Sequence, residues 1–279
     1  MKDWSLAIVA ITLIVLRSPC VVRAEEPAAV PAPPGGSKWE LRLDAHAGVP
    51  SGYVQVREFE LKGTRLRLRD DLGVDTSEAV GLTTRYHLTA RDAIRANFIY
   101  YFLDGTSHSD RARAWDGQAV GPGRITTNLD FMRLTAAYER ALFDIGDRGR
   151  VTGSGGLTYV HLNARLDRKA EDFYLQEFPV PLVGARFDYR LTDRLAATAS
   201  LEGGALPRVD SLRTEGGTVY LEQRHADAGL GLTYALRHNV SVGAGYSFTY
   251  FFQHENSHED DNRIQLMDHA VRLHVDVRF

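Results

Sequence analysis

Three pairs of histidine and aspartate stand two residues apart in this 279-residue sequence: Asp44 with His46, His225 with Asp227, and His274 with Asp276. A carboxylate beside an imidazole can orient the ring for general-base catalysis. No constellation with a nucleophile is visible around any of the pairs in the sequence. The simpler interpretation is that these residues belong to a hydrogen-bonded polar interior. We prefer this structural role to an enzymatic one.

A second group with binding chemistry lies in "HENSHEDDN" at 254–262. Its candidate metal ligands are His254, His258, Glu259 and Asp260, because imidazole and carboxylate groups bind divalent cations. A run of this composition is more often a solvated loop. We therefore predict no metal and no cofactor, and keep these four residues as the alternative.

Strands must position both groups, because apolar and polar residues alternate along most of the chain. In "VRLHVDVRF" at 271–279, Val271, Leu273, Val275, Val277 and Phe279 share one face, and polar residues occupy the other. The glycines of the fifth such segment blur its phase and suggest a bulge. Ten segments have this pattern: 39–48, 79–88, 94–102, 129–142, 149–164, 182–191, 194–205, 225–234, 240–252 and 271–279.

The connections between these segments alternate between short and long. Residues 89–92, 144–149, 192–194 and 236–239 are short, whereas residues 48–78, 105–127, 165–177, 207–218 and 254–263 are long and polar. A transmembrane barrel has short turns at one rim and long loops at the other, and its strands take roughly 9–11 residues to cross. The pattern predicts an all-β fold: a single antiparallel up-and-down barrel of about ten strands, with twelve or eight as alternatives. A periplasmic all-β protein is the competing class.

The first residues have the composition of an export signal. Lys2 precedes an apolar run that ends at Leu16, and Ala24 precedes an acidic start, so we expect cleavage after Ala24. We predict a signal peptide over 1–24, a Pro/Ala/Gly-rich disordered lead-in over 25–37 and a barrel over 38–279. The only cysteine, Cys20, leaves with the signal. The remaining net charge of −5, from 30 basic and 35 acidic residues, argues against nucleic acid.

The export signal and the terminal series Val271, Leu273, Val275, Val277 and Phe279 together resemble those of Gram-negative outer-membrane β-barrel proteins. In that class such a series is similar to the signal read by the barrel-assembly machinery. The resemblance covers the architecture of 38–279 and implies location in the bacterial outer membrane, contact with its lipid and lipopolysaccharide, and a monomer. It implies no specific activity. The segment "GTRLRLRDDLG" at 63–73 also resembles uncharacterised members of the class.

The inward faces of the predicted strands carry charges of both signs. A barrel of about ten strands has a lumen little wider than its side chains, so we expect an ion-pair network that fills it. The role predicted is structural or surface interaction, for envelope integrity or adhesion through the long loops. The alternatives are a narrow porin-like channel for small solutes or anions, and a lipid A-modifying or proteolytic enzyme with His225 and Asp227 near the outer rim. The predicted network is Arg42, Asp44, His46, Arg85, Arg95, Arg133, Glu139, Arg186, Asp188, Glu202, His225, Asp227, Arg272, His274 and Asp276.

Residues 54–71 do not fit ten strands. A turn at Lys62-Gly63 would place Glu58 opposite Arg67 and Phe59 opposite Leu66, with an apolar face too short to cross a bilayer. We interpret the segment as part of the first long loop, folded onto the barrel mouth. The alternative is two further strands, which would make twelve.

Overall fold

The computed structural model describes residues 38–57, 63–115, 118–120, 122–166, 173–175, 179–214, 218–258 and 261–279. Within these ranges, no helix has the length and apolar character needed to cross a membrane. The predicted signal peptide and lead-in lie outside the described residues.

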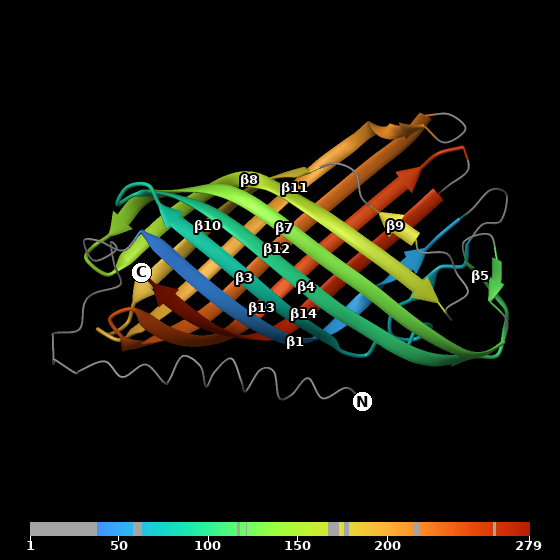
Figure 1. Ribbon diagram of the computed structural model, residues 1–279, viewed down its shortest axis with the longest axis horizontal. Helices are drawn as coiled ribbons and strands as arrows, with labels where there is room; N and C mark the ends of the chain where they lie inside the picture. Colours follow the sequence, from blue (N-terminus) through green and yellow to red (C-terminus); the bar gives the residue numbers. More distant parts are fainter. Residues whose placement is uncertain are drawn as a thin grey trace.

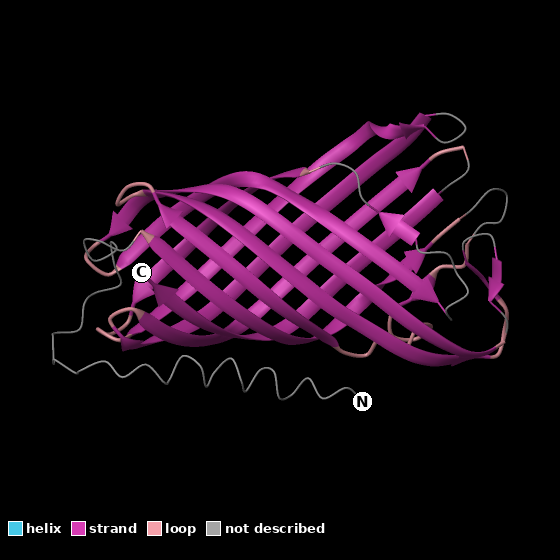
Figure 2. Ribbon diagram, viewed as in Figure 1, coloured by secondary structure: helices cyan, strands magenta, loops and turns pink. Residues whose placement is uncertain are grey.

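Among the described residues, ten long antiparallel strands close into a barrel (Figures 1 and 2). Each strand pairs with its neighbours along the chain, and β1 pairs with β14 to complete the ring. The prediction of an all-β barrel of about ten strands is confirmed. The barrel strands are β1 (Trp39–Gln55), β3 (Ser77–His87), β4 (Asp92–Ser109), β7 (Gly123–Ile145), β8 (Gly149–Leu166), β10 (Val180–Arg190), β11 (Leu195–Thr214), β12 (Thr218–Arg237), β13 (Val240–Asn256) and β14 (Asp261–Arg278).

Four short strands accompany the ring at the end that carries the long loops. They are β2 (Leu66–Arg67), β5 (Arg113–Trp115), β6 (Gln118–Val120) and β9 (Phe173–Leu175). The chain ends at the opposite rim, beside the short turns (Figure 1). We call the two parts of the barrel the short-turn half and the long-loop half.

Most barrel strands are longer than a membrane crossing requires. β1 has 17 residues and β7 has 23, against the roughly 9–11 that a tilted strand needs. The additional residues lie on the long-loop side. The sequence prediction ended these strands too early, because their chemical pattern changes where the crossing ends.

That change is clearest along β7, where every second residue keeps facing inward. In the short-turn half, Leu134 is 49% exposed on the outer face while Glu139 is 5% exposed on the inner face. In the long-loop half, Asp130 and Asn128 face outward and Phe131 is fully buried inside. The phase of the strand is unchanged but the chemistry of its two faces is exchanged. Lipid around the first half and water around the second half explain this exchange.

In the first long loop, the described residues 63–76 fold onto the barrel mouth. β2 pairs with β1, so that Arg67 lies opposite Tyr53 and Leu66 opposite Val54. Leu66 and Arg67 thus find partners on β1, whereas the predicted partners Glu58 and Phe59, and Lys62 of the predicted turn, lie outside the described residues. Burial explains this pairing. Leu66 and Leu68 enter the apolar core of the barrel, and this places their segment beside β1.

The structure also places the irregularity near 149–164 on the neighbouring strand. The register between β7 and β8 shifts between Ala141 and Phe143, which leaves Leu142 as the additional residue. The bulge therefore belongs to β7 at the short-turn rim, and β8 pairs without interruption.

Candidate functional site

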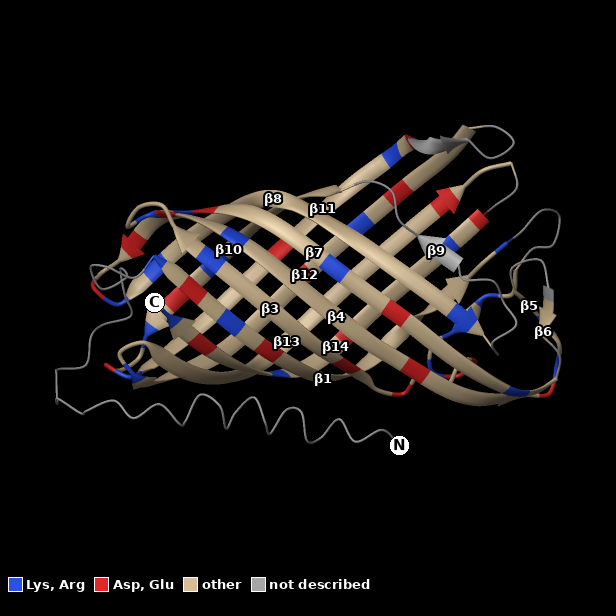
Figure 3. Ribbon diagram, viewed as in Figure 1, with Lys and Arg blue, Asp and Glu red and all other residues tan. Residues whose placement is uncertain are grey.

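Acidic and basic positions lie side by side on neighbouring strands of the barrel (Figure 3), and in the short-turn half their side chains form ion pairs. Glu139 on β7 is the centre of this network. Its carboxylate lies 2.7 Å from Arg85 Nε, 2.8 Å from Arg95 Nε and 3.4 Å from Arg186 Nη1. Arg85 also pairs with Glu40, and Arg95 with Glu202. Each charge thus has partners of opposite sign, as a charge removed from water requires.

A second set of ion pairs joins β1 to β14. Arg42 Nε donates to Asp276 Oδ1 at 2.6 Å, and Arg272 Nε lies 3.7 Å from Asp44 Oδ1. His274 Nε2 lies 3.0 Å from Thr233 Oγ1 and 3.6 Å from Asp276 Oδ2. Of the three His/Asp pairs in the sequence, His274 and Asp276 are the pair whose side chains meet.

Arg186 extends the network to β10 and β11. Its Nε donates to Asp188 Oδ2 at 2.9 Å, and Thr198 Oγ1 donates to Asp188 Oδ1 at 2.9 Å. With Glu139 they tie β7, β10 and β11 together across the lumen.

A layer of polar groups crosses the middle of the barrel. Arg133 Nη1 donates to Asp227 Oδ2 at 2.7 Å, and Thr249 Oγ1 donates to Asp227 Oδ1 at 2.9 Å. The Tyr101 hydroxyl lies 3.2 Å from Thr249 Oγ1. Asp227 is thus committed to an arginine and a threonine.

His225 lies beside this layer but does not join it. Its side chain is 4% exposed and its ring packs 5.1 Å from the ring of Phe251. Neither ring nitrogen has a hydrogen-bond partner among the described residues. The structure therefore does not bring His225 and Asp227 together as an acid–base pair.

Two further polar contacts lie at the level where the lumen changes from mainly charged to mainly apolar. Ser77 Oγ donates to Asp268 Oδ1 at 2.5 Å, with both residues buried. His46 Nδ1 lies 3.4 Å from Ser247 Oγ, and the His46 ring is 6.5 Å from that of Tyr101. His46 and its sequence partner Asp44 thus face different groups.

Above this level apolar side chains predominate in the lumen, although polar residues such as Gln223 and Gln253 are also buried there. The rings of Tyr101 and Phe131 lie 5.4 Å apart, and those of Phe131 and Phe251 lie 5.2 Å apart. The ion pairs of the predicted network therefore lie in the short-turn half and the middle layer of the barrel. The core of the other half includes Val54, Ile99, Leu103, Trp115, Ile125, Leu129, Val160, Leu162, Leu166, Ile264 and Leu266 from the strands, and Leu66, Leu68, Leu72 and Val74 from the first loop.

The first loop is held over this core by polar contacts with the second loop. Arg113 Nη2 donates to Asp71 Oδ1 at 2.9 Å, and Thr64 N donates to Ala114 O at 2.8 Å. Gly73 has φ +68°, and a Cβ at this position would meet Thr106 O at 2.2 Å. Only glycine permits this turn and this close approach. We call residues 63–76 the cap.

The metal candidates in the last loop are only partly described. His254 Nε2 lies 2.8 Å from Asp261 Oδ1, and Arg263 Nε donates to the same oxygen at 3.1 Å. Burial raises the pKa of the Asp261 carboxyl, but the contacts with His254 and Arg263 outweigh it, so the pKa lies below its usual range. Glu259 and Asp260 lie outside the described residues. In the part of the chain that is described, no group of three or more His, Cys, Asp or Glu residues could hold a metal ion.

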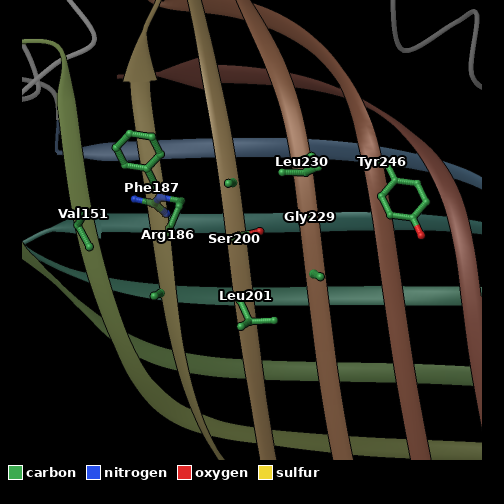
Figure 4. A pocket seen from close by; sticks show the side chains of 11 residues that line it. Val151, Arg186, Phe187, Ser200, Leu201, Gly229, Leu230 and Tyr246 are labelled. Carbon is green, nitrogen blue, oxygen red and sulfur yellow. The ribbon is translucent and has the colours of Figure 1, made fainter.

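The outer wall carries a shallow apolar groove of about 420 Å³ (Figure 4). The residues that line it include the small Ala199 and Ala228 and the larger Phe187, Leu201 and Leu230. Leu201 is 64% exposed and Leu230 is 61% exposed. A surface of this composition is expected on the lipid-facing side of a membrane barrel.

No family model and no curated protein matches the sequence. Among solved structures, the chain is similar to the outer membrane protease OmpT from Escherichia coli, with 10% identity, a TM-score of 0.53, and 86% of this chain and 97% of that chain covered. The chain has the fold of a Gram-negative outer-membrane β-barrel protein. At this identity the likeness shows the fold and carries no activity.

Two further similar structures are also outer-membrane barrels. The translocator domain of the autotransporter NalP from Neisseria meningitidis has 18% identity and a TM-score of 0.44, with 86% of this chain and 89% of that chain covered. The outer membrane protein OprG from Pseudomonas aeruginosa has 10% identity and a TM-score of 0.40, with coverages of 87% and 96%. In outer-membrane barrels the short turns face the periplasm and the long loops face the outside. By this rule the short-turn rim is periplasmic and the long-loop half is extracellular.

Several residues of the outer-membrane barrel's interior were missed by sequence reasoning. Ser77, Tyr101, Thr249 and Asp268 lie where the strands pass from lipid into water, and there a strand has similar residues on both faces. The segment "FIYYFL" at 98–103 is apolar on both faces for this reason. A run of this kind in the middle of a long alternating segment is the signal that could have found the crossing point.

Proposed function

We propose that the protein is a closed barrel of the bacterial outer membrane that does not conduct solutes and acts through its extracellular end, in envelope integrity or surface interaction. The packed apolar core under the cap is the observation that carries this proposal. Trp115, Phe131, Leu66 and Leu72 are fully buried there. A water-filled path requires a continuous lining of hydrated polar groups, whereas apolar side chains predominate in the long-loop half. Polar residues are also buried there, and two of them, Gln223 and Gln253, are hydrogen-bonded to each other at 2.8 Å.

The extracellular half favours a role at the surface. Its interior is a cluster of fully buried apolar side chains, and close-packed interiors of this kind are rigid. The cap is fastened to the second loop through Asp71 and Arg113. A rigid rim keeps its exposed residues in one arrangement, which reduces the ordering cost of binding a partner.

Conductance measurement tests the proposal. The full chain, purified and inserted into planar bilayers, is expected to give no discrete steps at either voltage polarity. A known porin inserted under the same conditions is the positive control. Reproducible steps from the purified chain would contradict a closed barrel and support the narrow channel instead.

A second measurement addresses the role itself. A strain that lacks the chain is expected to become more sensitive to detergents and to recover when the wild-type chain is restored. Unchanged sensitivity in the deletion strain would remove envelope integrity from the proposal and leave surface interaction.

A further inference from the structure

Two arginines on the extracellular half stack on aromatic rings of the outer wall. The guanidinium carbon of Arg65 lies 3.5 Å from the ring centroid of Tyr53, and that of Arg224 lies 5.7 Å from the ring centroid of Phe252. Tyr53 and Phe252 belong to the outward faces of β1 and β13. The stacking holds each cation against the wall of the barrel.

These two stacks are neighbours on the wall. Gln265 of β14 pairs with Tyr53 on one side and with Phe252 on the other. Because adjacent strands lie about 4.8 Å apart, the two rings are on the order of 10 Å from each other. Arg263, the next outward residue of β14, lies between the two strands and pairs with Gln55 and His254. Its side chain is 45% exposed.

The position of this group along the barrel points to the lipid surface. On the periplasmic side of it, Val271 and Leu273 of β14 are 62% and 58% exposed and have the character of hydrocarbon-facing residues. Outward aromatic residues mark the boundary between hydrocarbon and headgroups. Arginines that stack on such residues therefore lie at the level where lipid phosphate groups occur.

The chemistry of the three arginines fits phosphate. A guanidinium donates two parallel hydrogen bonds to a phosphate, and it can do so at its edge while its face remains stacked on a ring. Two acids hold the arginines in place, since Arg224 Nη2 lies 2.5 Å from Glu222 Oε1 and Arg263 Nε lies 3.1 Å from Asp261 Oδ1. Three cations against two acids leave a net positive surface.

The segment 63–73 positions one of the three arginines, Arg65. Its alternation buries Leu66 and Leu68 in the core and leaves Arg65 exposed on the outer side. The buried leucines thus fix the backbone from which Arg65 reaches Tyr53.

We propose that Arg65, Arg224 and Arg263 form a binding site for the phosphate groups of lipid in the outer leaflet, with a phosphorylated glycolipid such as lipid A as the ligand. This inference does not depend on whether the barrel conducts.

The test uses the full-length mature chain in detergent micelles and measures binding of lipid A by native mass spectrometry. Removal of one arginine is expected to weaken binding about fivefold, and the R65Q/R224Q double variant about 25-fold, because each arginine contributes about 1 kcal/mol at an anionic surface. Lipid A with its phosphates removed is expected to bind the wild type as weakly as intact lipid A binds the double variant.

Arg208 offers a matched control. Its guanidinium carbon lies 4.0 Å from the Tyr220 ring, four residues farther from the membrane along β12 than Arg224. The R208Q variant removes the same chemistry at a different level and is expected to bind lipid A like the wild type. A loss in R208Q equal to that in R224Q would overturn the assignment to these residues.

Three other results would also overturn the proposal. They are wild-type affinity in the double variant, equal binding of phosphorylated and dephosphorylated lipid A, and displacement of lipid A by an equimolar amount of inorganic phosphate. If the double variant does not fold, the comparison of the two lipids on the wild-type chain decides the question by itself.

Discussion

Trp39 and Phe279 exchange two backbone hydrogen bonds, each 3.0 Å long, in which the N–H of one residue donates to the carbonyl of the other. They join the start of β1 to the residue that follows β14. The Trp39 ring also packs against Tyr86 of β3, with the centroids 4.8 Å apart. The seam of the barrel is therefore closed at the periplasmic rim by backbone bonds and covered there by aromatic rings.

Substitution of Phe279 by proline removes the N–H that donates to Trp39. The free energy of unfolding in micelles is expected to fall by about 1–3 kcal/mol, because the Trp39 carbonyl loses its partner at a lipid-facing edge. The F279L variant keeps the donor and is the control, expected to unfold near the wild-type denaturant midpoint. Equal midpoints for the proline and leucine variants would contradict the contribution of this bond.

Substitution of Glu139 by glutamine keeps the shape of the side chain and removes the charge that three arginines share. We expect a loss of about 3–5 kcal/mol in the free energy of unfolding, because three arginines at once lose one of their acidic partners inside the lumen. Urea-induced unfolding, followed by circular dichroism, measures it. Asp144 is the matched control, since its ion pair with Arg150 is exposed at the rim. The D144N variant is expected to keep the wild-type midpoint, and a D144N loss as large as that of E139Q would refute the argument.

The cap should resist trypsin although Arg65, Arg67 and Arg69 are exposed on it, because Leu66, Leu68 and Leu72 anchor the same segment. The L72N variant buries an amide in an apolar core and is expected to be cut in the cap about tenfold faster. Mass spectrometry of timed digests gives the rates. The D75N variant changes an exposed residue of the cap and serves as the control. Rapid cleavage of the wild type at these arginines would show that the cap is not packed.

Replacement of His225 by alanine tests the enzymatic alternative. Because His225 packs on Phe251 inside a closed lumen, we expect reduced thermal stability together with unchanged lipid A and unchanged peptide profiles in the host strain. Mass spectrometry of both products measures this. A change in either profile, with the barrel present at normal levels, would restore a catalytic role for His225.

The membrane-spanning half of the fold follows from the sequence because one alternation rule governs it. Leu134 and Glu139, for example, take the faces that their polarity predicts, and the short turns end each crossing. The rule assumes that the outer face is the apolar one. It therefore ended the predicted strands where water replaces lipid. Ser77 fell into the predicted loop 48–78, and Asp268 fell between the predicted loop 254–263 and the last segment 271–279.

The partners inside the lumen were less predictable than the residues themselves. The sequence places Glu139, Arg95 and Arg186 on inward faces, but they belong to three different strands. Which of them meet depends on the tilt and stagger of the closed ring. His225 and Asp227 show the reverse difficulty, because their spacing in the sequence suggests a contact that Arg133 and Thr249 take instead.

Because the inner and outer faces exchange their chemistry along β7, the two halves of the barrel contribute differently to the heat-capacity change on unfolding. Heat-capacity change on unfolding comes mainly from apolar surface that becomes hydrated. In the membrane half, apolar groups face acyl chains and the interior is already polar. The large positive heat capacity of unfolding must therefore originate in the extracellular half, and cold should loosen that half while the membrane half persists.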